Sequence, residues 1–327
     1  MTRRLVVREE HWPLASAFVI ARGAKTQAHV LVVEIADQGA VGRGEAVPYA
    51  RYGQTMAGEL AQIEALRDAI ESGLSRQELQ GLAPAGAARN ALDCALWDLE
   101  AKLSGVPAWQ AAGRSRLDPV KTCFTISLDE PQAMAVAARA AARRPFLKLK
   151  IGGRDDLDRV IAVREAAPKA RLVVDANEGL EFEDLTRLAQ DFARLDVKLI
   201  EQPLKAGEDG VLEGYESPVP LCADESLHTR AELAICARRY GAVNVKLDKA
   251  GGLTEALAIV ADARSMGLQI MAGCMVATSL AMAPAMIIAQ GADVVDLDGP
   301  LLLAKDREPG LAFDGALIHP TPRELWG

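Results

Sequence analysis

Residues 171–201 read RLVVDANEGLEFEDLTRLAQDFARLDVKLIE and contain one complete strand–helix–strand unit. The β-branched run that opens the stretch predicts a buried strand, and the apolar spacing of 182–195 predicts an amphipathic helix. The short apolar run at 197–201 predicts the next strand. The two strands end in Asp175 and Glu201, so each closes on a carboxylate. A helix between two such strands is typical of a parallel β/α arrangement.

The same unit repeats on both sides of this stretch. Short β-type runs alternate with helical patterns, and strand starts recur roughly every 22–26 residues, the length of one β/α unit. An open doubly wound sheet would more often carry a Gly-rich phosphate loop after its first strand, and this chain has none there. We therefore predict a closed parallel barrel of the α/β class. Its eight predicted strands are 120–126, 146–150, 171–175, 197–201, 220–224, 242–246, 268–272 and 293–298.

The N-terminal part of the chain has a different pattern. β-type runs fill the first 50 residues or so, and helical patterns follow from 56 to about 112. Apolar residues between Ala91 and Leu99 have the spacing of a buried helix face, and a Gly-Val-Pro sequence ends that helix. Strands followed by helices predict a separate α+β domain. The predicted divisions are 1–115 for this domain, 116–303 for the barrel and 304–327 for a C-terminal segment that returns to the first domain.

Composition restricts the classes of function. The 327 residues are 50% hydrophobic and 25% charged, as in soluble globular proteins, and no apolar run reaches the ~20 residues of a membrane span. The formal net charge is −8 and basic residues do not cluster, which argues against nucleic-acid binding. Five scattered cysteines without a CxxC pair, and an N-terminus without a signal-peptide pattern, favour the cytoplasm. Barrels of this kind often associate, so we expect a homo-oligomer.

Three successive predicted strands end in carboxylates, Asp175, Glu201 and Asp224. Active sites of β/α barrels form at the carboxyl ends of the strands, and neighbouring strands lie about 4.8 Å apart. Three uncompensated carboxylates at that spacing would repel one another, and a divalent cation resolves the repulsion. Ligation by oxygen alone favours Mg²⁺ over Zn²⁺. The alternative is that acidic residues at strand ends cap the following helices, which explains one such residue more easily than three.

Lysines end the strands that flank this acidic trio. Lys148 and Lys150 share one side of the second strand, and Lys246 ends the sixth. Lysines that point into a barrel are costly unless they are functional, although a lysine at a strand end can also be a solvated charge. We interpret Lys249 in that second way because it lies beyond the strand.

Together these groups predict a proton transfer. A carboxylate bound to Mg²⁺ has a more acidic α-proton, because the metal stabilises the enediolate that forms on deprotonation. A lysine whose pKa is lowered by neighbouring cations can take that proton as a general base. A second lysine on the opposite face can return a proton and so invert the carbon.

Seven motifs follow one another along the chain: GRGEAVP (42–48), ALDCALWDLEAKLSGVP (91–107), KLK (148–150), DAN (175–177), EQPL (201–204), ADES (223–226) and KLDKAGG (246–252). In these motifs, and over nearly its whole length, the chain resembles enolase-superfamily enzymes of the muconate-lactonizing type. The resemblance implies a (β/α)7β modified TIM barrel beneath an N-terminal α+β capping domain. It implies one Mg²⁺ per subunit held by Asp175, Glu201 and Asp224, with Lys150 and Lys246 as the acid/base pair. Lys148 would then stabilise the enolate oxygens.

Two further features narrow the subgroup. The seventh strand is not followed by the histidine of the mandelate-racemase type, which disfavours acid-sugar dehydration. The eighth strand ends Asp296-Leu297-Asp298, similar to the Asp-x-Asp with which dipeptide epimerases bind a substrate ammonium; a loop-capping pair is the alternative. The stretch around Arg22 and Lys25 resembles the capping-domain flap, where either residue would pair with an acidic side chain such as glutamate.

The leading hypothesis is a Mg²⁺-dependent dipeptide epimerase, an isomerase that acts at the α-carbon of the C-terminal residue of L-Ala-D/L-Glu, in cell-wall peptide metabolism. A cycloisomerase or an o-succinylbenzoate synthase would use the same lysines and metal, but their substrates lack an ammonium. The same argument disfavours racemisation of N-acylamino acids. A barrel that binds a ligand without catalysis, or a Schiff-base aldolase, would not need both the lysines and the acidic trio.

Overall fold

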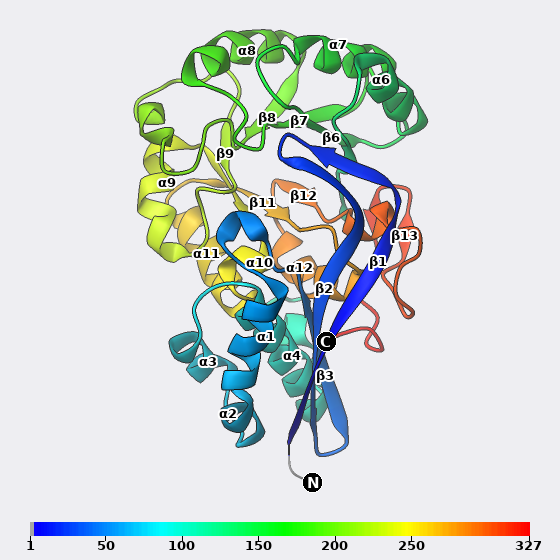
Figure 1. Cartoon of the computed structure of the whole chain (residues 1–327), viewed down its shortest axis with the longest axis vertical. Coiled ribbons are helices and arrows are strands. Elements are labelled where there is room, and N and C mark those ends of the chain that lie inside the picture. Colours follow the sequence, from blue (N-terminus) through cyan, green and yellow to red (C-terminus); the bar gives the residue numbers. More distant parts are fainter. Residues whose placement is uncertain (1–2) are drawn as a thin grey trace.

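The computed structural model describes residues 3–327, in which a barrel carries a second, smaller α+β part beside its mouth (Figure 1). The barrel is an eight-stranded parallel sheet in the order β12-β11-β10-β9-β8-β7-β6-β5. This confirms the predicted fold class. The strands are β5 (Phe124–Ile126), β6 (Phe146–Lys150), β7 (Arg171–Asp175), β8 (Val197–Glu201), β9 (Leu221–Ala223), β10 (Ala242–Val245), β11 (Gln269–Gly273) and β12 (Val294–Asp296).

The seam between β5 and β12 closes through loop contacts. Cys123 N donates to Val295 O at 2.8 Å, and Leu297 N donates to Thr122 Oγ1 at 2.9 Å. The predicted first strand, 120–126, is wrong in its first half. Its residues Val120–Lys121 form β4, which leaves the barrel and pairs with the C-terminal strand β14 (Leu317–Ile318) in a small antiparallel sheet with β13 (Phe313–Asp314).

Helices cover the outside of the barrel (Figure 1). One of them, α12 (Ser279–Ala289), has no amphipathic pattern, because ten of its 11 residues are buried. Its polar face is missing since the helix lies between the barrel and the capping strand β3. The others are α6 (Pro131–Ala140), α7 (Leu157–Ala166), α8 (Phe182–Arg194), α9 (Leu233–Arg239) and α11 (Leu253–Ser265). The one-turn helix α10 (Leu247–Ala250) is buried after β10, where it contacts α4 (Ala87–Ser104) of the capping part.

The capping part packs a three-stranded antiparallel sheet on the long helix α4 (Ala87–Ser104). The helix lies so close to β3 that a Cβ added at Gly44 would be 2.1 Å from the carbonyl oxygen of Ala91, which explains the glycines of the GRGEA sequence. Gly105 ends α4 in the left-handed conformation, as predicted. The remaining elements are β1 (Arg4–Ile20), β2 (Gly23–Asp37), β3 (Ala40–Ala46), α1 (Met56–Ala65), α2 (Arg67–Glu71), α3 (Arg76–Leu82) and α5 (Ala108–Ala111).

Two segments of the chain connect the capping part and the barrel. The β1–β2 hairpin extends from the capping sheet across the barrel mouth (Figure 1), where Leu128 N donates to Val19 O at 3.0 Å. The end of the chain returns to α4, where Trp326 Nε1 donates to Cys94 O at 3.0 Å. The domain boundaries at 115 and 303 stay a prediction, as do the cytoplasmic location and the homo-oligomer.

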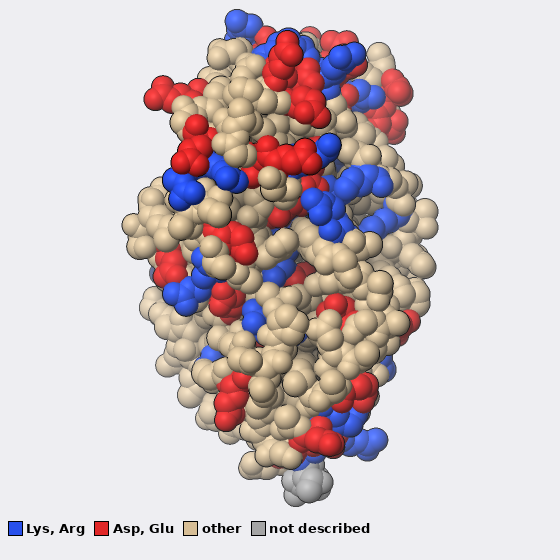
Figure 2. All heavy atoms as spheres, turned by 60° about the vertical axis from the view of Figure 1, so that its left-hand side comes forward, with Lys and Arg blue, Asp and Glu red and all other residues tan. Residues whose placement is uncertain are grey.

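The molecular surface carries both signs of charge. Figure 2 shows acidic and basic side chains interspersed over one face, with uncharged areas between them. Among residues 3–327, no helix is both long and apolar enough to cross a membrane.

Candidate active site

A cavity of about 470 Å³ lies at the carboxyl ends of the barrel strands, under the tip of the β1–β2 hairpin. The hairpin contributes Phe18 and Arg22, and the segment after β3 contributes Tyr49 and Tyr52. Phe18 lies over Lys150, with 5.9 Å between the ammonium nitrogen and the ring centroid. The cavity is therefore built by both parts of the chain, as expected for a site between a cap and a barrel.

The three predicted carboxylates lie where the sequence places them, at the ends of β7 and β8 and directly after β9, and all are buried. One oxygen of each is held by a donor of the surrounding protein. Asn177 N donates to Asp175 Oδ1 at 2.9 Å, and Asn244 Nδ2 donates to Glu201 Oε1 at 2.8 Å. The third donor, Lys249 Nζ, lies 2.6 Å from Asp224 Oδ1.

The other oxygen of each carboxylate faces one of the predicted lysines. Lys150 Nζ lies 2.5 Å from Asp175 Oδ2, and Lys148 Nζ lies 2.7 Å from Glu201 Oε2. Lys246 Nζ lies 2.6 Å from Asp224 Oδ2. These three lysines line the cavity although their side chains are almost fully buried.

Lys249 is not the solvated charge that the sequence suggested. Its side chain is 3% exposed and contacts Asp224 as well as Asn244 O, at 3.0 Å. The interpretation is wrong because the chain turns into the one-turn helix α10 after β10, and this turn directs Lys249 back beneath Asp224.

Burial and neighbouring charges set the pKa values of the trio in opposite directions. Burial opposes ionisation of Asp224, but Lys246 and Lys249 outweigh it and lower the pKa of Asp224 well below its usual range. Burial is likewise outweighed at Asp175, where Lys150 and Lys148 lower the pKa to about 2. At Glu201, burial and then the charge of Asp175 raise the pKa to about 7. The ionised form of Glu201 is therefore disfavoured in this arrangement, first by burial and then by its acidic neighbours.

Two of the lysines, Lys148 and Lys246, have raised pKa values in this arrangement. Burial would lower the pKa of Lys246, but Asp224 and Glu201 raise it well above its usual range. The prediction of a lysine with a lowered pKa is therefore not met at Lys246 while Asp224 pairs with it directly.

The two carboxylates of the eighth strand reach the cavity but differ from the prediction in one respect. Asp296 already has a positive partner, because its Oδ2 lies 2.7 Å from Lys148 Nζ. Asp298 Oδ2 accepts from Thr125 N at 2.6 Å. Burial and the charge of Asp296 raise the pKa of Asp298 to about 7. The resemblance implies that both carboxylates bind a substrate ammonium, which stays a prediction, but Asp296 already has a cationic partner within the protein.

The flap residues Arg22 and Lys25 both line the cavity. Arg22 is engaged: its guanidinium lies 2.7 Å from Glu225 Oε1 and 3.1 Å from Glu178 Oε2. Lys25 Nζ lies 4.8 Å from the centroid of the Tyr49 ring, and within residues 3–327 it has no ion-pair partner.

Sequence reasoning missed several buried groups beside the trio, among them Glu225 and Asn177. Glu225, next to Asp224, is 3% exposed, and its Oε2 has no hydrogen-bond partner among the described residues. Asn177 supplies the backbone donor to Asp175, and its own Oδ1 is also unpartnered there. Both belong to quoted motifs, ADES and DAN, whose second polar residue was the available signal.

The fold and this arrangement of carboxylates and lysines define a class of protein. A family model described as "Mandelate racemase / muconate lactonizing enzyme, N-terminal domain" matches residues 2–113. A second family model, described as "Enolase C-terminal domain-like", matches residues 132–306. The chain belongs to the mandelate racemase and muconate lactonizing enzyme family of the enolase superfamily, as the motifs predicted.

Individual relatives match almost the entire chain. It is 45% identical to the L-Ala-D/L-Glu epimerase of Escherichia coli (strain K12), over 97% of this chain and 99% of that protein. It is also 45% identical to an N-acetyl-D-glutamate racemase of a Pseudoalteromonas species, over 91% of this chain and 95% of that protein. A crystal structure from Agrobacterium tumefaciens matches with a TM-score of 0.98 and 50% identity, over 99% of this chain and 100% of that chain. It is described as an enolase family member with homology to dipeptide epimerases, with bound sodium and L-Ala-L-Glu. The prediction of an isomerase of the racemase and epimerase class is confirmed at that level.

Proposed function

We propose that the protein is a Mg²⁺-dependent dipeptide epimerase that inverts the α-carbon of the C-terminal residue, with L-Ala-D/L-Glu as its substrate. The supporting observation is the placement of Lys150 and Lys246. Lys150 ends β6, and Lys246 directly follows β10. These strands are four positions apart in an eight-stranded barrel, so the two lysines face each other across its mouth. A carbon held between them is open to a proton donor and acceptor on opposite faces.

The residues of the site fit a hard divalent cation. Asp175, Glu201 and Asp224 offer only oxygen. Burial and then the charge of Asp175 raise the pKa of Glu201 to about 7, and a bound cation would favour its ionised form. These three carboxylates would hold Mg²⁺. When bound, the ion would stabilise the negative charge that develops on the substrate carboxylate as the α-proton leaves.

The protein's own groups then carry the proton. One of Lys150 and Lys246 removes the α-proton, and the other returns a proton to the opposite face. Lys148, between Glu201 and Asp296, would hold negative charge on the substrate oxygens. The flap, with Phe18 over Lys150, would exclude water from the reacting carbon.

Recognition of the two ends of the substrate falls to the remaining predicted residues. Asp296 and Asp298 would bind the dipeptide ammonium, and Arg22 or Lys25 would bind the glutamate side chain. Arg22 has to exchange Glu225 or Glu178 for the substrate, whereas Lys25 has no such pair to break. Lys25 is therefore a stronger candidate than the sequence suggested.

One observation favours a second candidate, racemisation of N-acetylglutamate. Asp296 is already paired with Lys148, and Asp298 has a pKa of about 7, so the demand for a substrate ammonium is weaker than expected. A protonated Asp298 can donate a hydrogen bond to a neutral acyl group. The Pseudoalteromonas relative acts on such a compound by name. Cycloisomerase and o-succinylbenzoate synthase activities stay as the third alternative.

Isotope exchange tests the proposal. L-Ala-L-Glu and N-acetyl-L-glutamate are incubated separately with the full chain and Mg²⁺ in D₂O, and the glutamate α-proton is followed by NMR. We expect faster loss of the proton from the dipeptide, and loss of exchange with excess EDTA. Faster exchange in N-acetylglutamate would support the second candidate, and no exchange in either would exclude both. A cycloisomerase or synthase would then be sought with lactone and succinylbenzoate substrates.

A further inference from the structure

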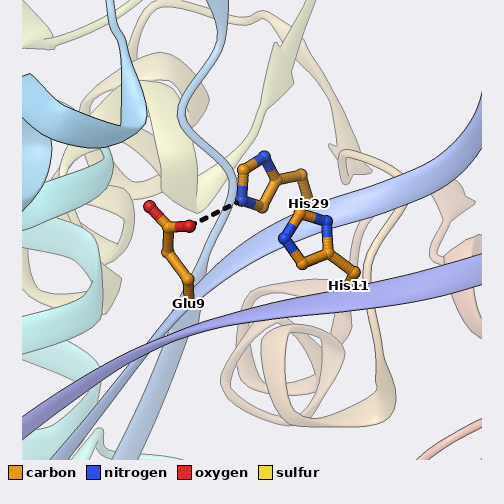
Figure 3. Close-up of side chains that lie close together, drawn as sticks. All are labelled: Glu9, His11 and His29. Carbon is orange, nitrogen blue, oxygen red and sulfur yellow. Dashed lines mark hydrogen bonds and ion pairs between the residues drawn. The ribbon is translucent and has the colours of Figure 1, made fainter.

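A second group of metal-ligating side chains lies on the β1–β2 hairpin, outside the cavity. His11 and His29 are directly opposite each other in the antiparallel register, and their rings stack with 4.0 Å between centroids. Glu9, two residues before His11, lies on the same side of β1, and its Oε2 is 3.2 Å from His29 Nε2. Figure 3 shows the three side chains close together, with the Glu9 carboxylate directed at the His29 ring.

We propose that these residues form a site for a transition-metal ion of the Zn²⁺ type. One ligand atom from each of the three lies within 4.8 Å of the other two. Two imidazoles and one carboxylate are a ligand set that holds Zn²⁺ and leaves a fourth position for water. The imidazole nitrogens distinguish the ligands of this site from the carboxylate trio in the barrel, whose oxygen ligands suit Mg²⁺.

The backbone prepares the site. Strand pairing fixes the Cα positions of His11 and His29, so that binding requires only rotations of partly exposed side chains. The register of the hairpin shifts between Pro13 and Phe18, directly beyond the site, and the strands then continue to the flap with Arg22. A bound ion would bridge β1 and β2 at the base of the flap.

Calorimetric titration of the tag-free full chain with ZnCl₂, in excess Mg²⁺, tests this site. We expect one Zn²⁺ per chain, and an affinity about tenfold or more lower in H11A and in H29A, because each loses one of three ligands. H319A is the matched control, since it removes a histidine elsewhere and should bind as the wild type does. A titration of H29A that equals the wild type would show that Zn²⁺ binds adventitiously or in the barrel, and would overturn the proposal.

An independent observation concerns the donors behind the acidic trio. Each carboxylate is backed by one donor: a backbone N–H at Asp175, the Asn244 amide at Glu201 and the Lys249 ammonium at Asp224. Only the last donor is charged. Lys249 Nζ also contacts Asp224 O and Asn244 O, so its three N–H groups meet three acceptors.

We infer that Lys249 is a positioning residue that fixes Asp224 with Oδ2 toward the cavity. It does not line the cavity and so does not touch a substrate held there. Fixing one oxygen of a metal-binding carboxylate prepares the other, and loss of such an outer partner typically weakens metal binding. The inference rests on the proposed function only in assuming that the trio binds Mg²⁺.

Direct Mg²⁺ binding to K249M separates this role from a structural one. We expect the Mg²⁺ affinity measured by calorimetry to fall by about 10–100-fold, whereas K198M, which changes an exposed lysine of β8, should bind as the wild type does. K249Q serves if K249M does not fold, and melting of the metal-free proteins reports stability separately. Equal or tighter binding in a folded Lys249 variant would overturn the inference. If the wild-type protein binds Mg²⁺ but does not epimerise the dipeptide, that result would instead count against the proposed function.

Discussion

Asp248 of the barrel and Asn90 of the capping helix α4 are joined across the interface, where Asn90 Nδ2 donates to Asp248 Oδ1 at 2.9 Å. Val47 N donates to the same oxygen at 2.8 Å. The converse contact also occurs, because Thr254 N of the barrel helix α11 donates to Asp93 Oδ2 of α4 at 3.0 Å. The barrel thus places the buried carboxylate of Asp248 against the capping part, and the capping part places that of Asp93 against the barrel.

This interface makes stability depend on pH. Burial raises the pKa of Asp248 to about 6, so the folded protein binds a proton that the unfolded chain releases near pH 4. The stability it contributes is present below about pH 4 and is lost as the pH rises through 6. D248N has no carboxyl group to ionise at this position, so it should not lose this stability. Its free energy of unfolding, relative to that of the wild type, should therefore increase by up to about 3 kcal/mol between pH 4 and 7.

Urea unfolding at several pH values measures this difference. D155N, which changes an exposed carboxylate, is the control and should run parallel to the wild type at all pH values. A constant difference between D248N and the wild type would contradict the assignment.

Glu45 connects the capping strand β3 to the loop before α12. It accepts from Thr278 N at 2.8 Å and pairs with Arg307 Nη2 at 2.7 Å. E45A removes the carboxylate that Thr278 N and Arg307 contact in this largely buried interface. We therefore expect the free energy of unfolding to fall by about 2–4 kcal/mol. A double-mutant cycle with R307A measures the pair. Additive effects of the two substitutions would show that the pair contributes nothing specific.

The carboxylates after β12 should distinguish the two candidate substrates. D298N retains a hydrogen-bond acceptor but cannot carry the charge that an ammonium needs. For L-Ala-L-Glu we expect kcat/KM to fall by about 10–100-fold, the loss of one charged hydrogen bond. For N-acetylglutamate we expect little change. Equal losses for both compounds would remove Asp298 from ammonium recognition.

The opposing lysines should fail in complementary ways. K150A and K246A should each lose epimerisation by about 10²–10⁴-fold, since each removes a general acid or base. Each variant should still exchange the α-proton of one epimer with D₂O, and the two variants should retain opposite epimers. K198A is the matched control. Exchange of both epimers by either variant would show that the removed lysine is not required.

Much of this arrangement follows from strand ends. Asp175 and Glu201 each close a short apolar run, and in a parallel barrel such ends meet at one mouth. Alternation along a strand was enough to place Lys148 and Lys150 on the same side. These predictions succeeded because they depend only on local pattern and on the common direction of the strands.

The errors lie where the chain leaves that regularity. Lys249 was misjudged because a single helical turn reverses its direction, and nothing in the local pattern requires that turn. The pairing of Asp296 with Lys148 joins the second and eighth strands of the barrel, so it depends on side-chain rotamers across the core. The departure of β4 from the barrel depends on a partner strand near the C-terminus, about 200 residues away.

The ion pairs of Arg22 with Glu225 and Glu178 change what an arriving acidic substrate encounters. If the proposed glutamate side chain binds at Arg22, its carboxylate would displace a carboxylate that the protein already supplies, whereas Lys25 has no such pair to give up. On that proposal the gain in free energy at Arg22 would be the difference between two similar ion pairs, so Arg22 would bind this side chain weakly. An epimerase has to release both epimers. An internal carboxylate that can return to Arg22 would help either epimer to dissociate.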